Sequence, residues 1–114
     1  MRTDLNYLKT MSNDDPDLMK EMIEIFNLQV NELSQEMQDL LENKEYETLG
    51  KVAHKAKTSV AIMGMNDLAK ELKDLELNTK ELKNTESYKD SVENFKIETE
   101  EAVKELNEFI KNLS

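Results

Sequence analysis

Hydrophobic residues recur along most of the chain at steps of three, four and seven, the spacing of one face of an α-helix. This spacing predicts a short helix over residues 4–11, with Leu5, Leu8 and Met11 facing inward. Residues 12–16 (SNDDP) then break the pattern, because they supply capping side chains and a proline suited to the first turn of a helix. The following helix is predicted over residues 16–43, with an inner stripe of Leu18, Met22, Ile25, Phe26, Leu33, Met37, Leu40 and Leu41.

Three more helices are predicted from the same spacing. The first covers residues 46–63, with an inner stripe of Leu49, Val52, Ala53, Ala56, Val60 and Met63. Gly64 follows this stripe, where a residue free to adopt positive φ is expected to end the helix. The next covers residues 66–82, starts at Asn66 or Asp67 as N-cap, and faces inward through Leu68, Ala69, Leu72 and Leu75. The last covers residues 88–113 and presents on one face Tyr88, Val92, Phe95, Thr99, Ala102, Val103, Leu106, Ile110 and Leu113.

These elements predict an all-α fold in a single domain over residues 1–114. The expected architecture is an antiparallel up-and-down four-helix bundle with a short additional N-terminal helix. Only two glycines and one proline interrupt the chain, which favours long helices over hairpins. A strict coiled coil is the alternative, but the apolar stripes are too broad and too often broken by loops for it.

The composition narrows the range of compartments and partners to be expected. The net charge of −10 argues against nucleic acid and anionic membrane surfaces, because both require a basic face. The absence of cysteine excludes disulfides and cysteine-based zinc sites. The N-terminal residues are polar and no apolar run approaches the length of a membrane span, so a cytoplasmic protein is expected.

One stretch departs from this acidic character. Residues 48–66 contain none of the 25 acidic residues, but they contain the only histidine, His54, and the lysines Lys51, Lys55 and Lys57. At 100° per residue, His54 lies roughly 150° from the centre of its helix's inner stripe, so it is expected to face outward. A lone histidine on an outward face is most often a solvated side chain, so its surroundings decide the interpretation.

The expected outward face combines positive charge with small and apolar side chains. Lys51, Thr58 and Ala61 share the side of His54, and Ile62 falls near its edge. Lys57 lies three residues on, within reach of a group attached to the imidazole. Gly50 is small and is expected to leave open space beside the ring. Together with Lys55, the rim residues Lys51, Thr58, Ala61 and Ile62 form a predicted partner-docking surface.

The chemistry of this face suits phosphoryl transfer. A neutral imidazole nitrogen can attack an activated phosphoryl group, and a lysine can balance the charge of the phosphoryl oxygens. One histidine without clustered outward carboxylates predicts no metal site. The chain has no glycine-rich phosphate loop, so a phosphoryl carrier without autonomous kinase activity is expected rather than an enzyme that uses ATP.

Residues 53–64 (AHKAKTSVAIMG) resemble the central motif of the histidine-containing phosphotransfer (HPt) domain family of two-component phosphorelays. The shared features are Ala53-His54, the apolar Ala56, Lys57, and Gly64 ten residues after the histidine. The segments over residues 17–26 and 68–76 are similar to the family's long second helix and to the helix that pairs with the histidine helix. The resemblance covers about residues 5–81.

The resemblance implies a role for three residues and a class of partner. His54 would be the phosphorylated nucleophile, Lys57 would stabilise the phosphoryl charge, and Glu76 would orient the imidazole. The partners would be receiver domains of response regulators and hybrid histidine kinases, with Mg²⁺ on the receiver and no cofactor on this chain. Thr58 departs from the family's usual glycine and narrows the approach to His54.

Two further interpretations remain open from the sequence. The chain could be an HPt-like binding module that docks on a receiver or histidine kinase and scaffolds or inhibits it without transfer; Thr58 is its main support. It could also be a helical oligomer that buries the face around Ile62 against itself. A monomer is the expected state.

Overall fold

The structure, a computed structural model, describes residues 3–113, and these residues form helices and no strands. Five α-helices and one short 3-10 helix follow one another along the chain: α1 (Asn6–Ser12), α2 (Pro16–Glu42), α3 (Tyr46–Ile62), α4 (Asn66–Glu81), η1 (Thr85–Ser87) and α5 (Tyr88–Leu113). All five predicted α-helices are present, and each predicted end lies within two residues of the observed one. The all-α prediction is confirmed.

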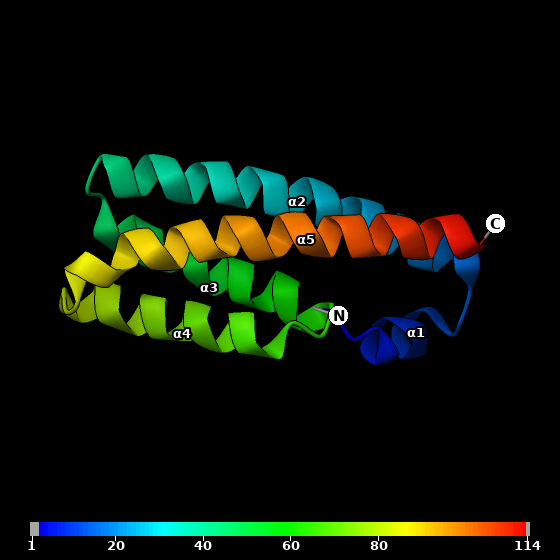
Figure 1. The fold of residues 1–114 in the computed structure, drawn as a ribbon. Coiled ribbons are helices and arrows are strands. Elements are labelled where there is room, and N and C mark those ends of the chain that lie inside the picture. Colours follow the sequence, from blue (N-terminus) through cyan, green and yellow to red (C-terminus); the bar gives the residue numbers. More distant parts are fainter. Residues whose placement is uncertain (1–2, 114) are drawn as a thin grey trace.

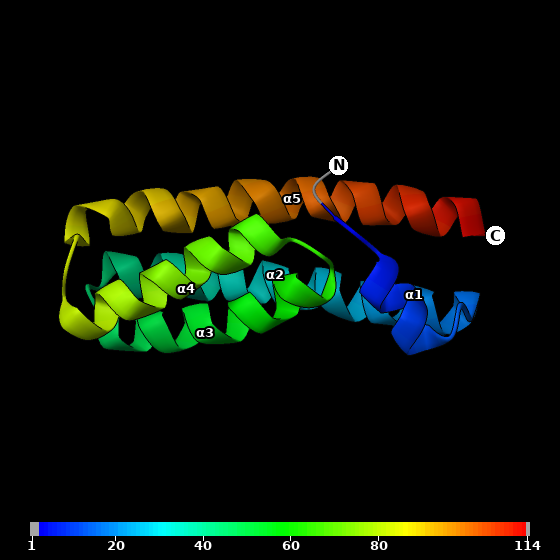
Figure 2. The same cartoon turned by 90° about the horizontal axis from the view of Figure 1, so that it is seen from below.

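The helices pack side by side into an elongated bundle with extents of 46 × 20 × 20 Å. Helix α3 contacts both α4 and α2, and α2 also contacts α5, so the α3–α4 pair and the α2–α5 pair lie on opposite sides (Figures 1 and 2). Helices α2 and α5 are longer than the other two and extend past them, and α1 packs against α2 at that end (Figure 2). Within residues 3–113, no helix combines the length and the apolar character needed to cross a membrane.

The core confirms the predicted inner face of α3 and corrects that of α2. All six predicted inner residues from Leu49 to Met63 are buried. In α2, however, Leu18 and Ile25 are 39% and 50% exposed, and the core instead receives Met19, Ile23 and Val30. The first turns of α2 carry apolar residues on more than one side, and the positions of α1 and α5 decide which side is covered. Steps of seven residues also drift by about 20° around a straight helix, which rotates a predicted stripe away from the buried one.

The short helix α1 and the start of α4 bring two further corrections. Leu8 is fully buried and Leu5 partly so, but Met11 is 57% exposed, because the seven residues of α1 contact the bundle through one narrow side. The N-cap position of α4 is held by Met65, without a capping side chain, and Asn66 and Asp67 lie inside the helix. Met65 is buried in the preceding turn, so the N-cap lies one residue before Asn66.

Two predicted helix ends are confirmed. Asp15 Oδ1 accepts hydrogen bonds from the backbone N–H groups of Asp17 and Leu18, at 3.0 and 3.4 Å, and the proline is the first residue of α2. Gly64 has φ of 73° and ends α3, as expected for a residue free to adopt positive φ. A Cβ atom on Gly64 would collide with Asp4, whose backbone N–H donates to the Met63 carbonyl at 3.0 Å. This contact ties the N-terminal segment to the turn between α3 and α4.

Candidate functional site

His54 lies near the middle of α3 on the side away from the core. Its side chain is 60% exposed, whereas Ala53 and Ala56 on either side of it are fully buried. The prediction that His54 faces outward is therefore confirmed, because the buried stripe of α3 leaves only one orientation for this position. Lys51, Lys55, Thr58 and Ala61 are exposed on the same helix.

The imidazole of His54 contacts a carboxylate from the neighbouring helix α4. Its Nδ1 atom lies 3.0 Å from Oε2 and 3.2 Å from Oε1 of Glu76. Because a carboxylate can only accept, the Nδ1–H group donates this hydrogen bond, which favours the tautomer in which Nε2 keeps a free lone pair. The two side chains come from positions 22 residues apart, and the packing of α3 on α4 brings them together.

Glu76 joins the imidazole to two lysines. Its side chain is only 14% exposed, and the Nζ atoms of Lys57 and Lys80 lie 3.6 Å and 4.0 Å from its carboxylate oxygens. Burial acts to raise the pKa of Glu76, but the hydrogen bond and charge of His54, with the charges of Lys57 and Lys80, together lower it below its ordinary value. Glu76 is thus a carboxylate at neutral pH, able to accept a hydrogen bond from Nδ1–H and to balance positive charge on the ring.

Lys57 is held beside the imidazole rather than extended into water. Its side chain is 27% exposed, and its ion pair with Glu76 restricts where the ammonium group can go. Because His54 contacts the same carboxylate, the ammonium and the imidazole share one small region of the surface. An anionic group attached to the imidazole would meet this positive charge without a large movement of either helix.

Gly50 does not leave open space beside the ring, so that prediction is wrong. The residue is buried, and a Cβ atom there would overlap Oγ1 of Thr79 and lie 3.2 Å from its Cβ. Gly50 therefore allows α3 and α4 to approach closely one turn before His54. Thr79 Oγ1 in turn donates to the backbone carbonyl of Glu76 at 2.8 Å, so this close contact lies directly beside the residue that holds the imidazole.

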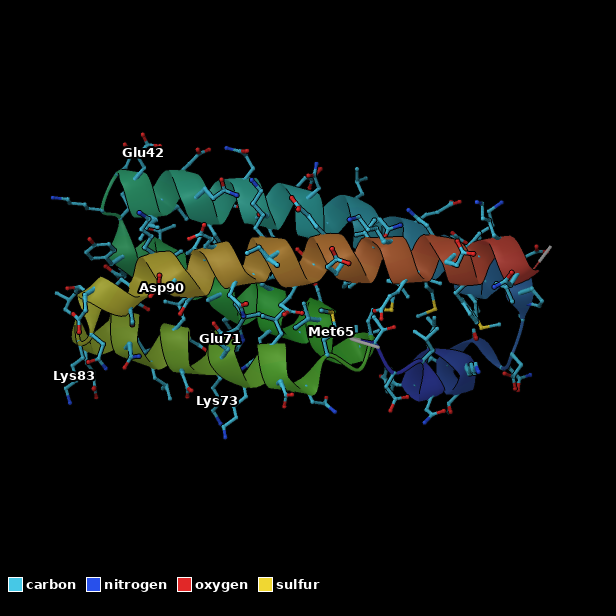
Figure 3. All side chains as sticks on the ribbon, viewed as in Figure 1. Glu42, Met65, Glu71, Lys73, Lys83 and Asp90 are labelled. Atoms are coloured by element: carbon cyan, nitrogen blue, oxygen red, sulfur yellow. The ribbon has the colours of Figure 1, made fainter. Side chains whose placement is uncertain are left out.

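The rim of the site extends beyond the predicted docking residues. A shallow hollow of about 610 Å³ is lined by Thr58, Ala61 and Ile62 from α3, and by residues that the sequence did not indicate: Tyr7, Ala69, Lys70 and Lys73. Ala69, predicted to face inward, is only partly buried. Lys73 projects from α4 away from the bundle (Figure 3). Helical spacing identifies neighbours on one helix only, so the contributions of α1 and α4 required the packing of the helices.

Replacing Glu76 by glutamine tests its carboxylate through the pH dependence of stability. Folding lowers the pKa of Glu76, so the carboxylate's contribution to the free energy of unfolding is complete above the ordinary value of 4.5 and is lost as the pH falls through the lowered value. We expect Glu76→Gln to cost about 1 kcal/mol at pH 7 and clearly less at about pH 3. Urea denaturation at both pH values measures this difference.

Glu81 provides the matched control for that measurement. It lies on the same helix and forms an ion pair with Lys83 at 3.1 Å, but its side chain is 62% exposed. Glu81→Gln is therefore expected to change stability by less than about 0.5 kcal/mol at either pH. A cost of Glu76→Gln that stays the same from neutral to acidic pH would contradict the assigned ionisation.

Metal ligation finds no support in the described part of the chain, where no three His, Cys, Asp or Glu side chains are grouped so that they could hold an ion. Comparison with protein-family models, with curated proteins and with solved structures finds no match.

Proposed function

We propose that this protein is a phosphorelay carrier of the HPt type, which accepts a phosphoryl group from a receiver-domain aspartate on His54 and passes it to another receiver domain. The observation that carries the proposal is the contact of His54 Nδ1 with the Glu76 carboxylate, at 3.0 Å, on an imidazole that is 60% exposed. The carboxylate fixes the tautomer of the ring, and the exposure leaves the ring accessible to a partner.

The transfer step uses the Nε2 lone pair of His54 as the nucleophile. A bond forms between Nε2 and phosphorus, the bond between phosphorus and the receiver's acyl oxygen breaks, and the receiver's aspartate leaves as a carboxylate. The ring then carries positive charge, which Glu76 balances through the hydrogen bond to Nδ1. Lys57 lies beside the phosphoryl oxygens, and the receiver supplies Mg²⁺. Transfer to a second receiver is the same step in reverse.

The proposed architecture is an antiparallel up-and-down four-helix bundle formed by α2 to α5, with α1 as the additional short helix. Short connections of three or six residues join these helices, which favours antiparallel neighbours. Contacts of α3 with α2 and α4, and of α2 with α5, support this arrangement.

The proposed partners are receiver domains of response regulators and hybrid histidine kinases in the cytoplasm, each binding one copy of the protein. They would dock over the exposed residues of α3 around the imidazole, which are Lys51, Lys55, Thr58 and Ala61, and over the half-buried Ile62. The hollow beside Ile62 can receive an apolar side chain of the receiver.

A non-transferring binding module is the second candidate, and the position of Thr58 favours it. Thr58 is exposed one turn beyond His54, so its β-branched side chain stands on the path of an approaching receiver. If transfer is blocked there, the same surface would bind receivers and compete with their proper partners.

Transfer of labelled phosphate tests the proposal directly. Receiver domains carrying a ³²P-labelled aspartyl phosphate are mixed with the protein, and the labelled protein is then exposed to acid and to alkali. We expect label that is lost in acid and kept in alkali, as for a phosphoramidate, and that maps to the peptide containing His54. If the receivers bind but none transfers label, the binding module is the correct function. Label that survives acid would place the phosphate on another residue type.

A further inference from the structure

A groove separate from the hollow beside Ile62 runs between α2 and α5, on the side of the bundle opposite to His54. It has a volume of about 830 Å³, and its buried lining residues are Val30 and Ser34 from α2 and Thr99 from α5. Leu28 lines it as well and is 64% exposed. The α2 residues of the groove span positions 24–38, which corresponds to about 21 Å or four helical turns. These dimensions suit a single helix lying along the groove.

The α2 side of this α2–α5 groove is rich in uncharged amides. Successive turns of α2 place four of them along the groove: Asn27, Asn31, Gln35 and Gln38. With Leu28 and Val103 they form a surface of apolar groups and neutral amides, which costs less to remove from water than charged groups when the amides form hydrogen bonds with the partner. Such a strip resembles the centre of a protein interface more than a solvated helix face.

The two helices that form the groove are strongly acidic as a pair. Helix α2 carries seven acidic residues and one basic residue, and α5 carries seven acidic and four basic residues, so the two helices together hold a net charge of −9. Helices α3 and α4 together carry six of each and are neutral. Glu24 and Glu100 line the groove itself, as do Lys96 and Lys104, of which Lys104 is paired with Glu101 at 3.3 Å.

We propose that the α2–α5 groove docks a basic amphipathic helix of a partner protein. Its apolar side chains, at steps of three and four, would pack on Leu28 and Val103, and its lysines or arginines would pair with acidic residues of α2 and α5. A second copy of this chain is a poor occupant, because its own α2–α5 pair also carries a net charge of −9 and the two pairs would repel each other. Anionic membranes and nucleic acids are excluded by the same sign of charge.

The groove and the His54 face lie on opposite sides, so both can be occupied together. A basic helix bound between α2 and α5 would leave the imidazole open to a receiver. The protein would then act as a tethered carrier, held to one partner while exchanging phosphate with another. The groove's own occupancy does not depend on transfer at His54.

A designed peptide pair tests the proposal. The probe is a fluorescent helical peptide of about 18 residues with leucines at steps of three and four and lysines elsewhere, and its counterpart has glutamates in place of the lysines. Fluorescence anisotropy is expected to show binding of the lysine peptide and none of the glutamate peptide. In the ¹⁵N NMR spectrum, the lysine peptide should shift the side-chain amide signals of Asn27, Asn31, Gln35 and Gln38.

Two variants with the same change of net charge distinguish binding in the groove from general electrostatic attraction to an acidic protein. Leu28→Lys places a positive charge in the groove, and Leu77→Lys places one at a 49% exposed position on α4. We expect Leu28→Lys to weaken binding at least about ten-fold and Leu77→Lys less than about two-fold. Equal weakening by both, equal binding of both peptides, or amide signals that do not shift would overturn the proposal. Sedimentation showing a dimer that Leu28→Lys dissociates would instead make the groove a self-association surface.

Discussion

Replacement of His54 by glutamine is expected to reduce phosphoryl uptake to background. Glutamine can still accept or donate a hydrogen bond near Glu76, but its amide nitrogen has no free lone pair to attack phosphorus. The side chain is 60% exposed, so the substitution removes no core contact and the bundle should remain folded. Uptake is measured as acid-labile label transferred from a phosphorylated receiver, with circular dichroism to check helicity.

The control for this variant is Lys89→Gln, which places the same new side chain at an exposed position on α5, far from the proposed site. It should take up label at the wild-type rate within about two-fold. Receiver affinity should survive His54→Gln as well, because docking uses the surrounding face and not the nucleophile alone. Labelling of His54→Gln at the level of the wild type would contradict the phosphorelay proposal.

Gly50→Val is expected to have the second largest effect, although residue 50 makes no contact with a substrate. The new Cβ would overlap Thr79 Oγ1 and lie 3.6 Å from the backbone carbonyl of Glu76, so its methyl groups would push α4 away from α3. We expect a loss of about 3 kcal/mol of stability and a fall in melting temperature of about 10 °C. Transfer should also slow, because Glu76 moves with α4 away from the imidazole.

A matched substitution and a double-mutant cycle isolate this close contact. Thr48→Val puts the same side chain at an exposed position of α3 and should change stability by less than about 0.5 kcal/mol. Thr79→Ala removes the hydroxyl that the side chain introduced by Gly50→Val would meet. The double variant should therefore recover at least about 1 kcal/mol relative to the sum of the single effects. Strictly additive effects would show that Gly50 does not set the distance between the helices.

The sequence predicted best what a single helix determines by itself. In α3, the small residues Ala53 and Ala56 and the bulky Leu49 and Val60 share one unbroken stripe, so the buried side and the outward direction of His54 followed from geometry alone. In α2, apolar residues surround more of the helix, and packing against α1 and α5 selected Ile23 rather than Ile25 for the core. Periodicity cannot make that selection, because it contains no information about neighbours.

The candidate site depends on distances between helices, and the sequence predicts these less well. Only the resemblance to a family placed Glu76 near the imidazole. Lys80 was not predicted, although its spacing of four residues from Glu76 on one helix face is a signal that could have identified it. The prediction of open space at Gly50 failed because a missing side chain looks the same in a sequence whether water or another helix fills its place. The structure shows that Thr79 fills it.

The hydrogen bond from Asp4 to the Met63 carbonyl has a practical consequence for handling the protein. It anchors the N-terminal segment at the end of α3, and Tyr7, a few residues on, already lines the hollow beside Ile62. An affinity tag or fluorescent protein fused to the N-terminus would therefore begin close to the surface proposed to receive partners. The final turns of α5 lie at the same end of the bundle as α1 but extend beyond it (Figure 1), past the ends of α3 and α4, so immobilisation through the C-terminus is the better choice for binding assays.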